Sequence, residues 1–483
     1  MVLGTTSGAG KSWLATALCR WFARQGLRVA PFKAQNMSNN ARVVAGGEIG
    51  SAQYFQALAA RATPDVRMNP VLLKPETDTR SQVVVLGRVD TALARQDWRA
   101  RCAAVWPTVC QALDGLIATH DVVVIEGAGS PAEINLADCD IVNMRVAAHA
   151  GAACLLVTDI DRGGAFAHLY GTWALLPPAQ RALIRGFVLN RFRGDPALLL
   201  PGPRMLQDLT GVPTLATLPM WREHGLPEED GVDERSHRDA GDILRTLAVI
   251  AFPRISNLDE YQPLRHLPGV RLVWARSPAE LDGLQAGDWI ILPGSKATSA
   301  DLAWLRAHGL DRAVAGHAAR GGTVLGVCGG MQMLGEALID PHGIDGNAPG
   351  LGLLPLVTVF AVDKTVRRSH AAFTALRGVW APLSGLSVPG YEIHHGQTQQ
   401  HPAMAAAGDV AHVAAQAGMA WQNAAGNVLG LYLHGLFEEP AVLRALFGAA
   451  VPTLDTVFDG LAVFLEQHAV PGALAGLVAS TPS

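Results

Sequence analysis

The segment GTTSGAGKS, residues 4–12, decides the fold of the first half of this chain. It follows the short apolar run of residues 1–3 and precedes a stretch whose apolar residues, from Leu14 to Phe22, share one helical face. A glycine-rich loop between a strand and a helix surrounds a phosphate with backbone N–H groups, and the helix N-terminus adds its positive end. We therefore predict an α/β domain that binds a nucleotide at this loop.

The residues of this loop have distinct expected roles. Gly8 and Gly10 would let backbone N–H groups approach the phosphates of ATP. Lys11 would reach the terminal phosphates, and Ser12 would bind Mg²⁺. Only three residues precede Gly4, fewer than the roughly five of a typical strand. We expect either a short first strand or a native start further upstream.

Polar residues also follow other apolar runs of the first half. The predicted strands are residues 28–32, 121–125, 154–158, 187–190 and 214–218. Active-site loops gather at the carboxyl ends of parallel strands, so Glu126 and Asp159 are candidate Mg²⁺ ligands. Lys33 and Asn190 are candidate nucleotide contacts for the same reason. Either carboxylate could instead cap or brace a loop, and Asn190 could contact the adenine edge or only protein.

One polar run stands out in the first half. Gln35, Asn36 and Asn39 lie in a segment polar enough to line a pocket for amides or carboxylates. Together with Lys74, they are our candidates for substrate contacts. A solvated loop is the alternative interpretation of this run.

Lysine is rare in this chain. Of 38 lysine and arginine residues, five are lysines: Lys11, Lys33, Lys74, Lys296 and Lys364. A planar guanidinium cannot replace a compact ammonium where a phosphate or a tight pocket needs a point charge. We therefore expect most of the five lysines to be functional.

The second half carries one cysteine in a setting that the other five lack. Residues 323–334, TVLGVCGGMQML, run from an apolar strand through small residues around Cys328 into a helix. Glycines permit the tight turn that exposes such a side chain, and a helix N-terminus favours the reactive thiolate. We predict that Cys328 is a nucleophile; a buried structural cysteine is the alternative.

A thiolate nucleophile needs a general base. His434 is the first candidate, because it follows an apolar strand near the end of the second domain. His394 and His395, in GYEIHHG, are rival candidates. Any of the three could equally be a packed or substrate-facing histidine.

Backbone N–H groups for an oxyanion hole have two candidate sources. Gly294 and Ser295 follow the apolar strand of residues 289–292, and Gly329 follows the nucleophile itself. Such groups would stabilise negative charge that develops on a carbonyl oxygen. A plain turn explains Gly294 and Ser295 equally well.

These motifs divide the chain into two domains. Short apolar strands alternate with helical patterns over residues 1–225, and the charged, Gly- and Pro-containing stretch 226–245 is typical of an exposed linker. A second such region spans residues 246–440, and we expect the helical tail 441–483 to pack on it. The predicted class is α/β, with two parallel-sheet, three-layer domains.

Composition narrows the classes of function. Hydrophobic residues make up 49% and charged residues 17%, enough apolar material for large cores. The net charge of −4 disfavours a nucleic-acid partner held by phosphate contacts. The chain has no C-x-x-C pair, so its cysteine spacing does not suggest a zinc site. No apolar run reaches the roughly 18 residues that are needed to cross a bilayer. We expect a cytoplasmic protein that meets small molecules, and an oligomer is possible.

The motifs resemble those of the cobyric acid synthase family of cobalamin biosynthesis. In that family a dethiobiotin-synthetase-like P-loop ATPase precedes a flavodoxin-like class I glutamine amidotransferase domain. The five residues between Gly4 and Gly10, one more than the standard P-loop has, are typical of the dethiobiotin-synthetase branch. The segments that carry the resemblance are, in order, GTTSGAGKS, PFKAQNMSNN, MNPVLLKPETD, VVIEGAGSPAEINL, TDIDRGGAF, FVLNRFRGD, FPRISNLDE, LPGSKAT, GVCGGMQMLG, YEIHHGQT and LYLHGLFE.

The resemblance implies Cys328 as the nucleophile and His434 as the base of glutamine hydrolysis. Ammonia would pass to the first domain, where ATP would activate four side-chain carboxylates (b, d, e and g) of adenosylcobyrinic acid a,c-diamide for amide formation. The usual triad has a Glu two residues after the His, but Leu436 occupies that position here, and the cobyric and cobyrinic synthases are similar in lacking that Glu. What orients His434 stays open, and we expect slow glutamine hydrolysis unless the partner site is occupied.

Two other functions compete with this one. Cobyrinic acid a,c-diamide synthase combines the same two activities on an earlier corrinoid, although PFKAQNMSNN and FPRISNLDE favour the later enzyme. A nonenzymatic P-loop switch that recruits partners would not need the turn at Cys328. Assays with each corrinoid, and labelling of Cys328 by a glutamine-mimicking diazo-ketone, separate these functions.

Overall fold

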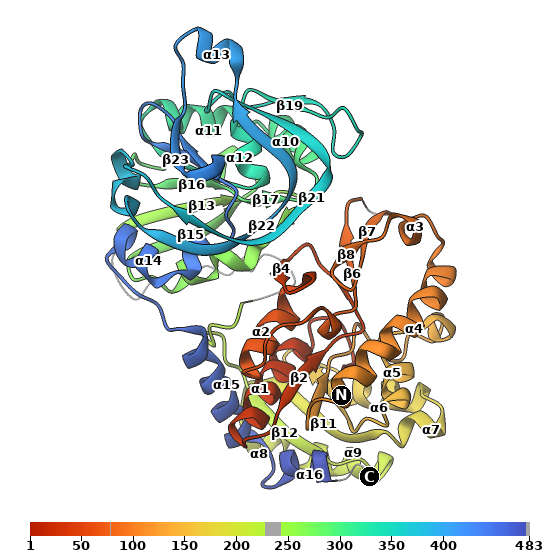
Figure 1. Ribbon diagram of the computed structural model, residues 1–483. Coiled ribbons are helices and arrows are strands. Elements are labelled where there is room, and N and C mark those ends of the chain that lie inside the picture. The colour runs from red at the N-terminus through yellow and green to blue at the C-terminus, as the bar shows by residue number, and fades with distance from the viewer. Residues whose placement is uncertain (78, 228–242, 480–483) are drawn as a thin grey trace.

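The first domain is built on a twisted parallel sheet of short apolar strands. The computed structural model describes residues 1–77, 79–227 and 243–479, and Figure 1 shows this domain below the second one. A bridge between Val2 and Glu126 joins two sets of strands side by side. The strand order is β2 (Val29–Phe32), β9 (Val122–Ile125), β1 (Val2–Gly4), β10 (Cys154–Asp159), β11 (Ile184–Phe192) and β12 (Thr214–Pro219).

Helices cover both faces of this sheet. Successive side chains of a strand point to opposite faces, so Leu155 and Val157 enter one helical core and Leu156 enters the other. One face carries α1 (Lys11–Arg24), α2 (Ser51–Ala59) and α15 (Leu454–His468). The other carries α4 (Trp98–Ile117), α5 (Met144–His149), α6 (Ala165–Leu175) and α9 (Pro201–Thr210). The α/β prediction is confirmed here. The shorter helices are α3 (Thr91–Ala94), α7 (Pro178–Arg181) and α8 (Pro196–Leu199).

Two small β structures of the first domain lie on its side toward the second domain (Figure 1). One is the hairpin of β4 (Ala41–Val44) and β5 (Gly47–Gly50). The other is a sheet of β3 (Gln35–Met37), β6 (Val71–Pro75), β7 (Ser81–Val85) and β8 (Arg88–Val89). The predicted polar run of residues 35–40 therefore begins as a paired strand, with Gln35 and Asn36 in register with Val71 and Leu72.

The second domain has a seven-stranded sheet in which five strands are parallel. Its order is β15 (Val270–Ala275), β13 (Arg245–Ile250), β16 (Trp289–Leu292), β18 (Thr323–Val327), β25 (Val428–Leu431), β24 (Ala420–Gln422) and β23 (His412–Ala415). The last two strands are antiparallel. The helices α10 (Thr298–Ala307), α11 (Leu310–Ala319) and α12 (Gly329–Leu334) follow β16 and β18 along the chain.

A long antiparallel pair also belongs to this domain. β21 (Leu356–Ala372) and β22 (Ser387–Gln400) pair along most of their length. Their apolar residues, among them Phe360 and Val388, join the same core as the parallel strands. The remaining elements are β14 (Ile255–Ser256), β17 (Gly294–Ser295), β19 (Ala337–Ile339), β20 (Ala348–Pro349) and α13 (Pro402–Ala406).

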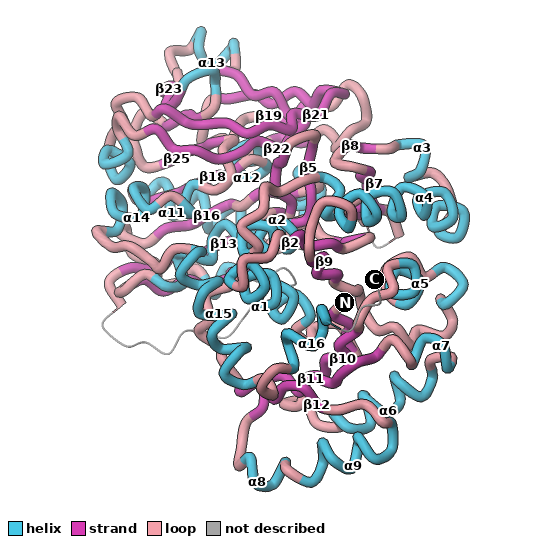
Figure 2. The backbone as a smooth tube through the Cα atoms, turned by 60° about the horizontal axis from the view of Figure 1, so that its bottom comes forward, coloured by secondary structure: helices cyan, strands magenta, loops and turns pink. Residues whose placement is uncertain are grey.

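The C-terminal tail departs from the expectation that it packs on the second domain. Only α14 (Pro440–Phe447) does so. α15 returns to the first domain, where Phe458 and Leu461 pack in the core beside α1, and α16 (Ala473–Ala479) follows it (Figure 2). An apolar helical face does not specify which core it covers, so the sequence alone did not decide this.

Two further expectations concern the linker and the membrane. Within the predicted linker 226–245, residues 228–242 lie outside the described residues, and β13 begins at Arg245. Among the residues that the structure describes, no helix has the length and apolar character needed to cross a membrane.

Candidate functional site

Cys328 lies at the junction of β18 and α12, as the glycine pattern predicts. Its backbone has φ 52° and ψ −109°, a conformation that L-residues rarely adopt, and its N–H donates to Leu431 O at 2.8 Å. Gly330 makes the turn possible, because a Cβ there would lie 1.9 Å from Leu292 O. The strained turn holds the thiol at the carboxyl edge of the sheet.

His434 follows β25 and faces this thiol. Cys328 is among the groups that raise the pKa of its imidazole, and Cys328 Sγ also donates to Ile393 O at 3.6 Å. The other side of the ring meets Glu260, with 3.0 Å between Nδ1 and Oε1. Glu260 Oε2 also accepts the backbone N–H of Gly435 at 2.9 Å. Glu260 therefore occupies the orienting role that the sequence left open at Leu436.

The charges around this histidine are buried. Glu260 and His434 are each 1% exposed. Burial lowers the pKa of His434, but the Glu260 carboxylate and Cys328 outweigh burial and raise it to about 10. A charged imidazolium beside the sulfur stabilises a thiolate, the reactive form of cysteine. The three side chains can therefore form a nucleophile, a proton carrier and an orienting acid.

The two rival histidines have other partners. Both nitrogens of His394 are engaged, Nδ1 with Gly396 O at 2.8 Å and Nε2 with Glu392 at 3.2 Å. His395 Nδ1 meets Ala361 O at 3.1 Å. Both side chains line the cavity beside Cys328, while the hydrogen bonds of their rings go to these other partners.

The candidate oxyanion residues lie together next to the nucleophile. A Cβ on Gly329 would be 2.8 Å from Ser295 N, and one on Gly294 would be 3.1 Å from His434 Cε1. Ser295 Oγ donates to Asp301 at 2.6 Å, which fixes the turn. The structure thus brings both candidate sources of N–H groups to one side of Cys328.

The cavity at Cys328 has a volume of about 80 Å³ and is lined by both domains. Lys74, which we had grouped with Gln35 and Asn36, lies here, with its Nζ 2.9 Å from Glu48. Lys364 binds the same carboxylate, and Lys296 binds Glu76 of the first domain at 3.0 Å. Three of the five lysines therefore gather at the domain interface beside the thiol.

The other two lysines lie at the phosphate loop. Lys11 Nζ donates to Thr6 O and Gly129 O at 3.0 and 3.1 Å. Lys33 Nζ and Ser12 Oγ both donate to Glu126 Oε1 at 2.9 Å. Burial raises the pKa of Glu126. The charge of Lys33 chiefly, together with the hydrogen bonds that Glu126 accepts, outweighs burial and lowers this pKa below its ordinary value. A charged carboxylate beside a hydroxyl fits the oxygen ligands that Mg²⁺ prefers.

Asp159 and Asn190 have protein partners near this loop. Asp159 is 4% exposed and pairs with Arg191 at 2.8 Å, and no hydrogen bond between described residues connects it to Ser12 or Glu126. Asn190 Nδ2 donates to Ala9 O at 2.9 Å, and a Cβ on Gly10, whose φ is 100°, would lie 2.0 Å from the same nitrogen. Asn190 therefore braces the phosphate loop.

A cavity of about 620 Å³ opens at the phosphate loop. One part is lined by Lys33, Asn36 and Glu126, and Asn36 Nδ2 also donates to Gln53 Oε1 at 3.3 Å. Asn39 is absent from this lining, and its buried Oδ1 has no hydrogen-bond partner among the described residues.

Aromatic side chains also line this cavity. Trp221 and Phe464 lie with ring centroids 4.7 Å apart, and Trp13 meets Phe464 edge-on at 5.8 Å. Phe464 belongs to α15, so the C-terminal tail completes the nucleotide cavity. The sequence around these aromatic residues gave no sign of a binding role. Trp221 adjoins a stretch typical of a linker, and Phe464 belongs to a run of apolar residues at helical spacing.

Comparison with known proteins identifies the family. A model described as "CobQ/CobB/MinD/ParA nucleotide binding domain" matches residues 1–230, and one described as "CobB/CobQ-like glutamine amidotransferase domain" matches residues 246–442. A protein of Polaromonas naphthalenivorans named cobyric acid synthase is 73% identical over 99% of both chains. The chain belongs to the cobyric acid synthase family. Relatives of the same name from Variovorax paradoxus and Paracidovorax citrulli are 72% and 74% identical, over 99% and 97% of this chain and 99% and 96% of theirs.

The sequence analysis of this cobyric acid synthase family member did not identify Glu260 as a residue of the site, although the segment around it was recognised. Glu260 lies in FPRISNLDE, one of the segments that carried the family resemblance. Nothing in that segment pairs it with His434 by spacing, because the two are 174 positions apart. The segment was recognised, but the role of its acid was not.

Proposed function

We propose that this chain is a glutamine-hydrolysing, ATP-dependent ligase. It amidates the b, d, e and g carboxylates of adenosylcobyrinic acid a,c-diamide and yields adenosylcobyric acid. The observation that carries the proposal is that one chain holds both the Cys328–His434–Glu260 arrangement and a phosphate loop whose Ser12 meets Lys33 at Glu126. The shared name of the relatives supports a corrinoid as the acceptor.

Glutamine hydrolysis would proceed at Cys328. The thiolate attacks the side-chain amide carbon of glutamine, and the imidazolium of His434 gives its proton to the departing ammonia. The N–H groups of Gly329 and Ser295, which lie close to each other beside Cys328, would stabilise the oxygen that gains negative charge. Neutral His434 then takes a proton from water as the water attacks the thioester, the sulfur leaves as the thiolate, glutamate is released, and the thiolate–imidazolium pair is restored.

Amide formation would proceed at the phosphate loop. A carboxylate is a poor acyl donor, so the γ-phosphoryl group of ATP passes to a carboxylate oxygen of the corrinoid, and ammonia then displaces phosphate. Lys11 and Lys33 stabilise the charge of the transferred group. Ser12 and Glu126 are the residues that would hold Mg²⁺, which neutralises phosphate charge when bound. The adenine ring would lie against Trp221 and Phe464.

Product analysis tests this function directly. The protein is incubated with ATP, Mg²⁺, glutamine and either cobyrinic acid or its adenosylated a,c-diamide, and the corrinoids are weighed by mass spectrometry. We expect four successive replacements of a hydroxyl by an amino group on the a,c-diamide. Formation of only two amides, on cobyrinic acid alone, would instead assign the earlier step.

The variant Cys328→Ala separates the two activities. It should lose glutamine-dependent amidation, because the substitution removes the thiol beside His434, while ammonium salts still support amide formation at the other cavity. Product formation with each nitrogen source is the measurement. Loss of amidation with ammonium as well would refute two separable sites.

A further inference from the structure

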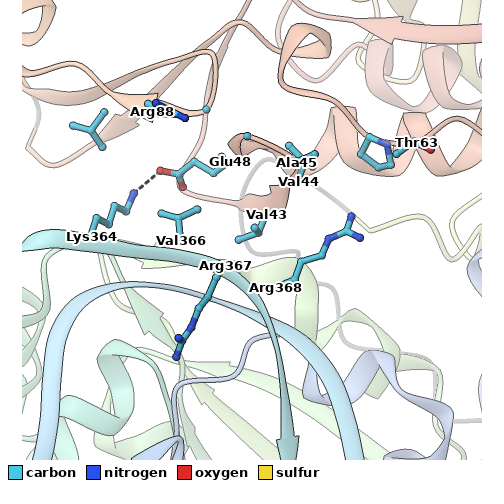
Figure 3. Close-up of a pocket in the computed structure, with 15 residues that line it drawn as sticks. Val43, Val44, Ala45, Glu48, Thr63, Arg88, Lys364, Val366, Arg367 and Arg368 are labelled. Atoms are coloured by element: carbon cyan, nitrogen blue, oxygen red, sulfur yellow. Dashed lines mark hydrogen bonds and ion pairs between the residues drawn. The ribbon is translucent and has the colours of Figure 1, made fainter. Parts of the chain in front are cut away.

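The β4–β5 hairpin of the nucleotide-binding domain makes direct contact with the segment that carries Glu260. Ala41 N donates to Asn257 Oδ1 at 2.9 Å, and Leu258 N donates to Asn40 Oδ1 at 3.0 Å. Figure 3 shows the next part of the hairpin, Val43 to Glu48, facing Lys364 of β21 across the domain boundary. One domain therefore supplies part of the support for the other domain's catalytic turn.

Arg42 is the central side chain of this contact. It is 2% exposed, and its guanidinium binds Asp259, with 3.1 Å between Nε and Oδ2, and Glu438, with 2.6 Å between Nη2 and Oε1. A buried guanidinium needs such partners because an unpaired charge is strongly disfavoured there. Asp259 directly precedes Glu260, and Glu438 lies four residues after His434. Arg42 thus holds the chain on both sides of the Glu260–His434 pair.

Aromatic rings complete the link between Arg42 and His434. The guanidinium lies 5.1 Å from the centroid of the Tyr391 ring, and the same ring stacks on His434 at 5.2 Å with 20° between planes. Arg42 also lies over Phe55, at 5.0 Å, on α2 of its own domain. Side chains of both domains therefore pack against Arg42 and hold it in one position.

The segment that holds Glu260 is itself under backbone constraint. Asn257 has φ 53°, in the left-handed region, and it begins the turn of residues 257–260. A residue other than glycine keeps such an unfavourable backbone conformation only when the surrounding structure holds it there. Here the fixing contacts come from Asn40, Ala41 and Arg42 of the nucleotide-binding domain.

We propose that Arg42 is a positioning residue for glutamine hydrolysis, supplied by the nucleotide-binding domain and acting through Asp259 on Glu260 and His434. The inference rests on the proposed function. It makes glutamine hydrolysis dependent on the docking of the two domains. The same hairpin continues into α2, whose Gln56 donates to Glu126 at 2.5 Å, so the positioning contact and the phosphate loop share one short stretch of chain.

Arg42→Met and Arg42→Lys test the proposal in the full chain. We expect Arg42→Met to lower kcat for glutamine hydrolysis about 10²-fold, the loss that a 1 Å displacement of catalytic groups produces. KM for glutamine should change little, because Arg42 does not line the cavity at Cys328. Arg42→Lys should recover part of kcat, since it keeps the charge but not the two-carboxylate fork.

The matched control is Arg20→Met. Arg20 is also a fully buried arginine of the first domain, paired with Asp455 and Asp459 and lying over Phe458, but all of these partners lie on the tail. It should lower the melting temperature as Arg42→Met does, and leave kcat for glutamine hydrolysis unchanged. A merely structural role of Arg42 would make the two variants alike.

Ammonium-driven amidation distinguishes failure of this inference from failure of the proposed function. Wild type and Arg42→Lys should form amides with ammonium at similar rates. Unchanged glutamine kcat in both Arg42 variants, or equal losses with glutamine and ammonium, would overturn the positioning role. If Arg42→Met does not fold, the kcat of Arg42→Lys for glutamine hydrolysis tests the positioning role instead. We expect this kcat to be at least tenfold below that of the wild type. Absence of amide product from wild type with either nitrogen source would refute the proposed function instead.

Discussion

At the residue scale, the acid that orients His434 comes from a different part of the chain than in the usual triad. Glu260 accepts a hydrogen bond from Nδ1–H of His434, so Nε2 is the ring nitrogen that remains to serve the thiol. Fixing the tautomer and stabilising the imidazolium are what an acid contributes in such a site. Because Glu260 also binds Gly435 N, it holds the ring and its backbone together.

Glu260→Gln should shift the pH dependence of glutamine hydrolysis. The Glu260 carboxylate raises the pKa of His434, so without it the imidazolium loses its proton at lower pH. The thiolate–imidazolium pair then disappears earlier as pH rises, and the alkaline limb of the kcat/KM profile moves toward neutral pH. We also expect kcat to fall about 10²-fold or more. Steady-state rates of glutamate release across pH measure both effects.

Ammonium-driven amidation is the internal control for Glu260→Gln. It takes place at the phosphate loop and should keep its wild-type rate. An alkaline limb that stays in place would mean that Glu260 does not set the charge of His434.

The residues of the site differ in how far sequence alone could reach them. Cys328 lies where local glycines require a turn, and Lys11 lies where a strand, a loop and a helix follow directly, so both were predictable from their neighbours. Glu260 and Arg42 act on His434 only after folding brings remote segments together. The surroundings of Lys74 were out of reach for the same reason, since its partner Glu48 and its neighbour Lys364 meet only at the domain interface.

At the element scale, buried parallel strands were predictable because each is a short apolar run. The predicted strands at 154–158 and 214–218 correspond to β10 (Cys154–Asp159) and β12 (Thr214–Pro219). β21 and β22 were missed, since their middle is rich in polar residues and their stability depends on pairing with each other. The β4–β5 hairpin was likewise missed, since each of its strands has four residues and its stability also depends on pairing.

Gly330→Ala tests the element that carries the nucleophile. A methyl group at 330 would lie 1.9 Å from Leu292 O, so the start of α12 must move away from β16. We expect about 1–3 kcal/mol of destabilisation, typical of overpacking, and loss of glutamine hydrolysis because Cys328 moves with the turn. Thermal melting and glutaminase assays measure the two effects. Gly171→Ala on α6 is the control, since a methyl group there has no atom within 4 Å; equal behaviour of both variants would contradict the tight-turn argument.

At the scale of the whole molecule, the C-terminal tail connects the two domains a second time. After α14 on the glutamine amidotransferase domain, α15 packs against α1, and Asp455 and Asp459 pair with the buried Arg20. The tail thereby places Phe464 in the wall of the nucleotide cavity. Residues from both ends of the chain thus form one binding site.

Phe464→Leu should weaken ATP binding with little effect on folding. Leucine keeps most of the apolar contact with Trp221 and Trp13 but removes the aromatic face. Stacking of a base on an aromatic ring contributes about 1–3 kcal/mol, so we expect KM for ATP to rise about tenfold. The measurement is ammonium-driven amidation at varied ATP, which removes glutamine hydrolysis from the rate.

The glutamine side of the reaction provides the comparison for this variant. Glutamate release at saturating glutamine without ATP should match the wild type in Phe464→Leu, because the Cys328 cavity contains no residue of α15. Tyr170→Leu, an exposed aromatic on α6 that does not line the nucleotide cavity, should leave KM for ATP unchanged. If Phe464→Leu also leaves it unchanged, the tail contributes only packing, and the adenine ring lies elsewhere in the cavity.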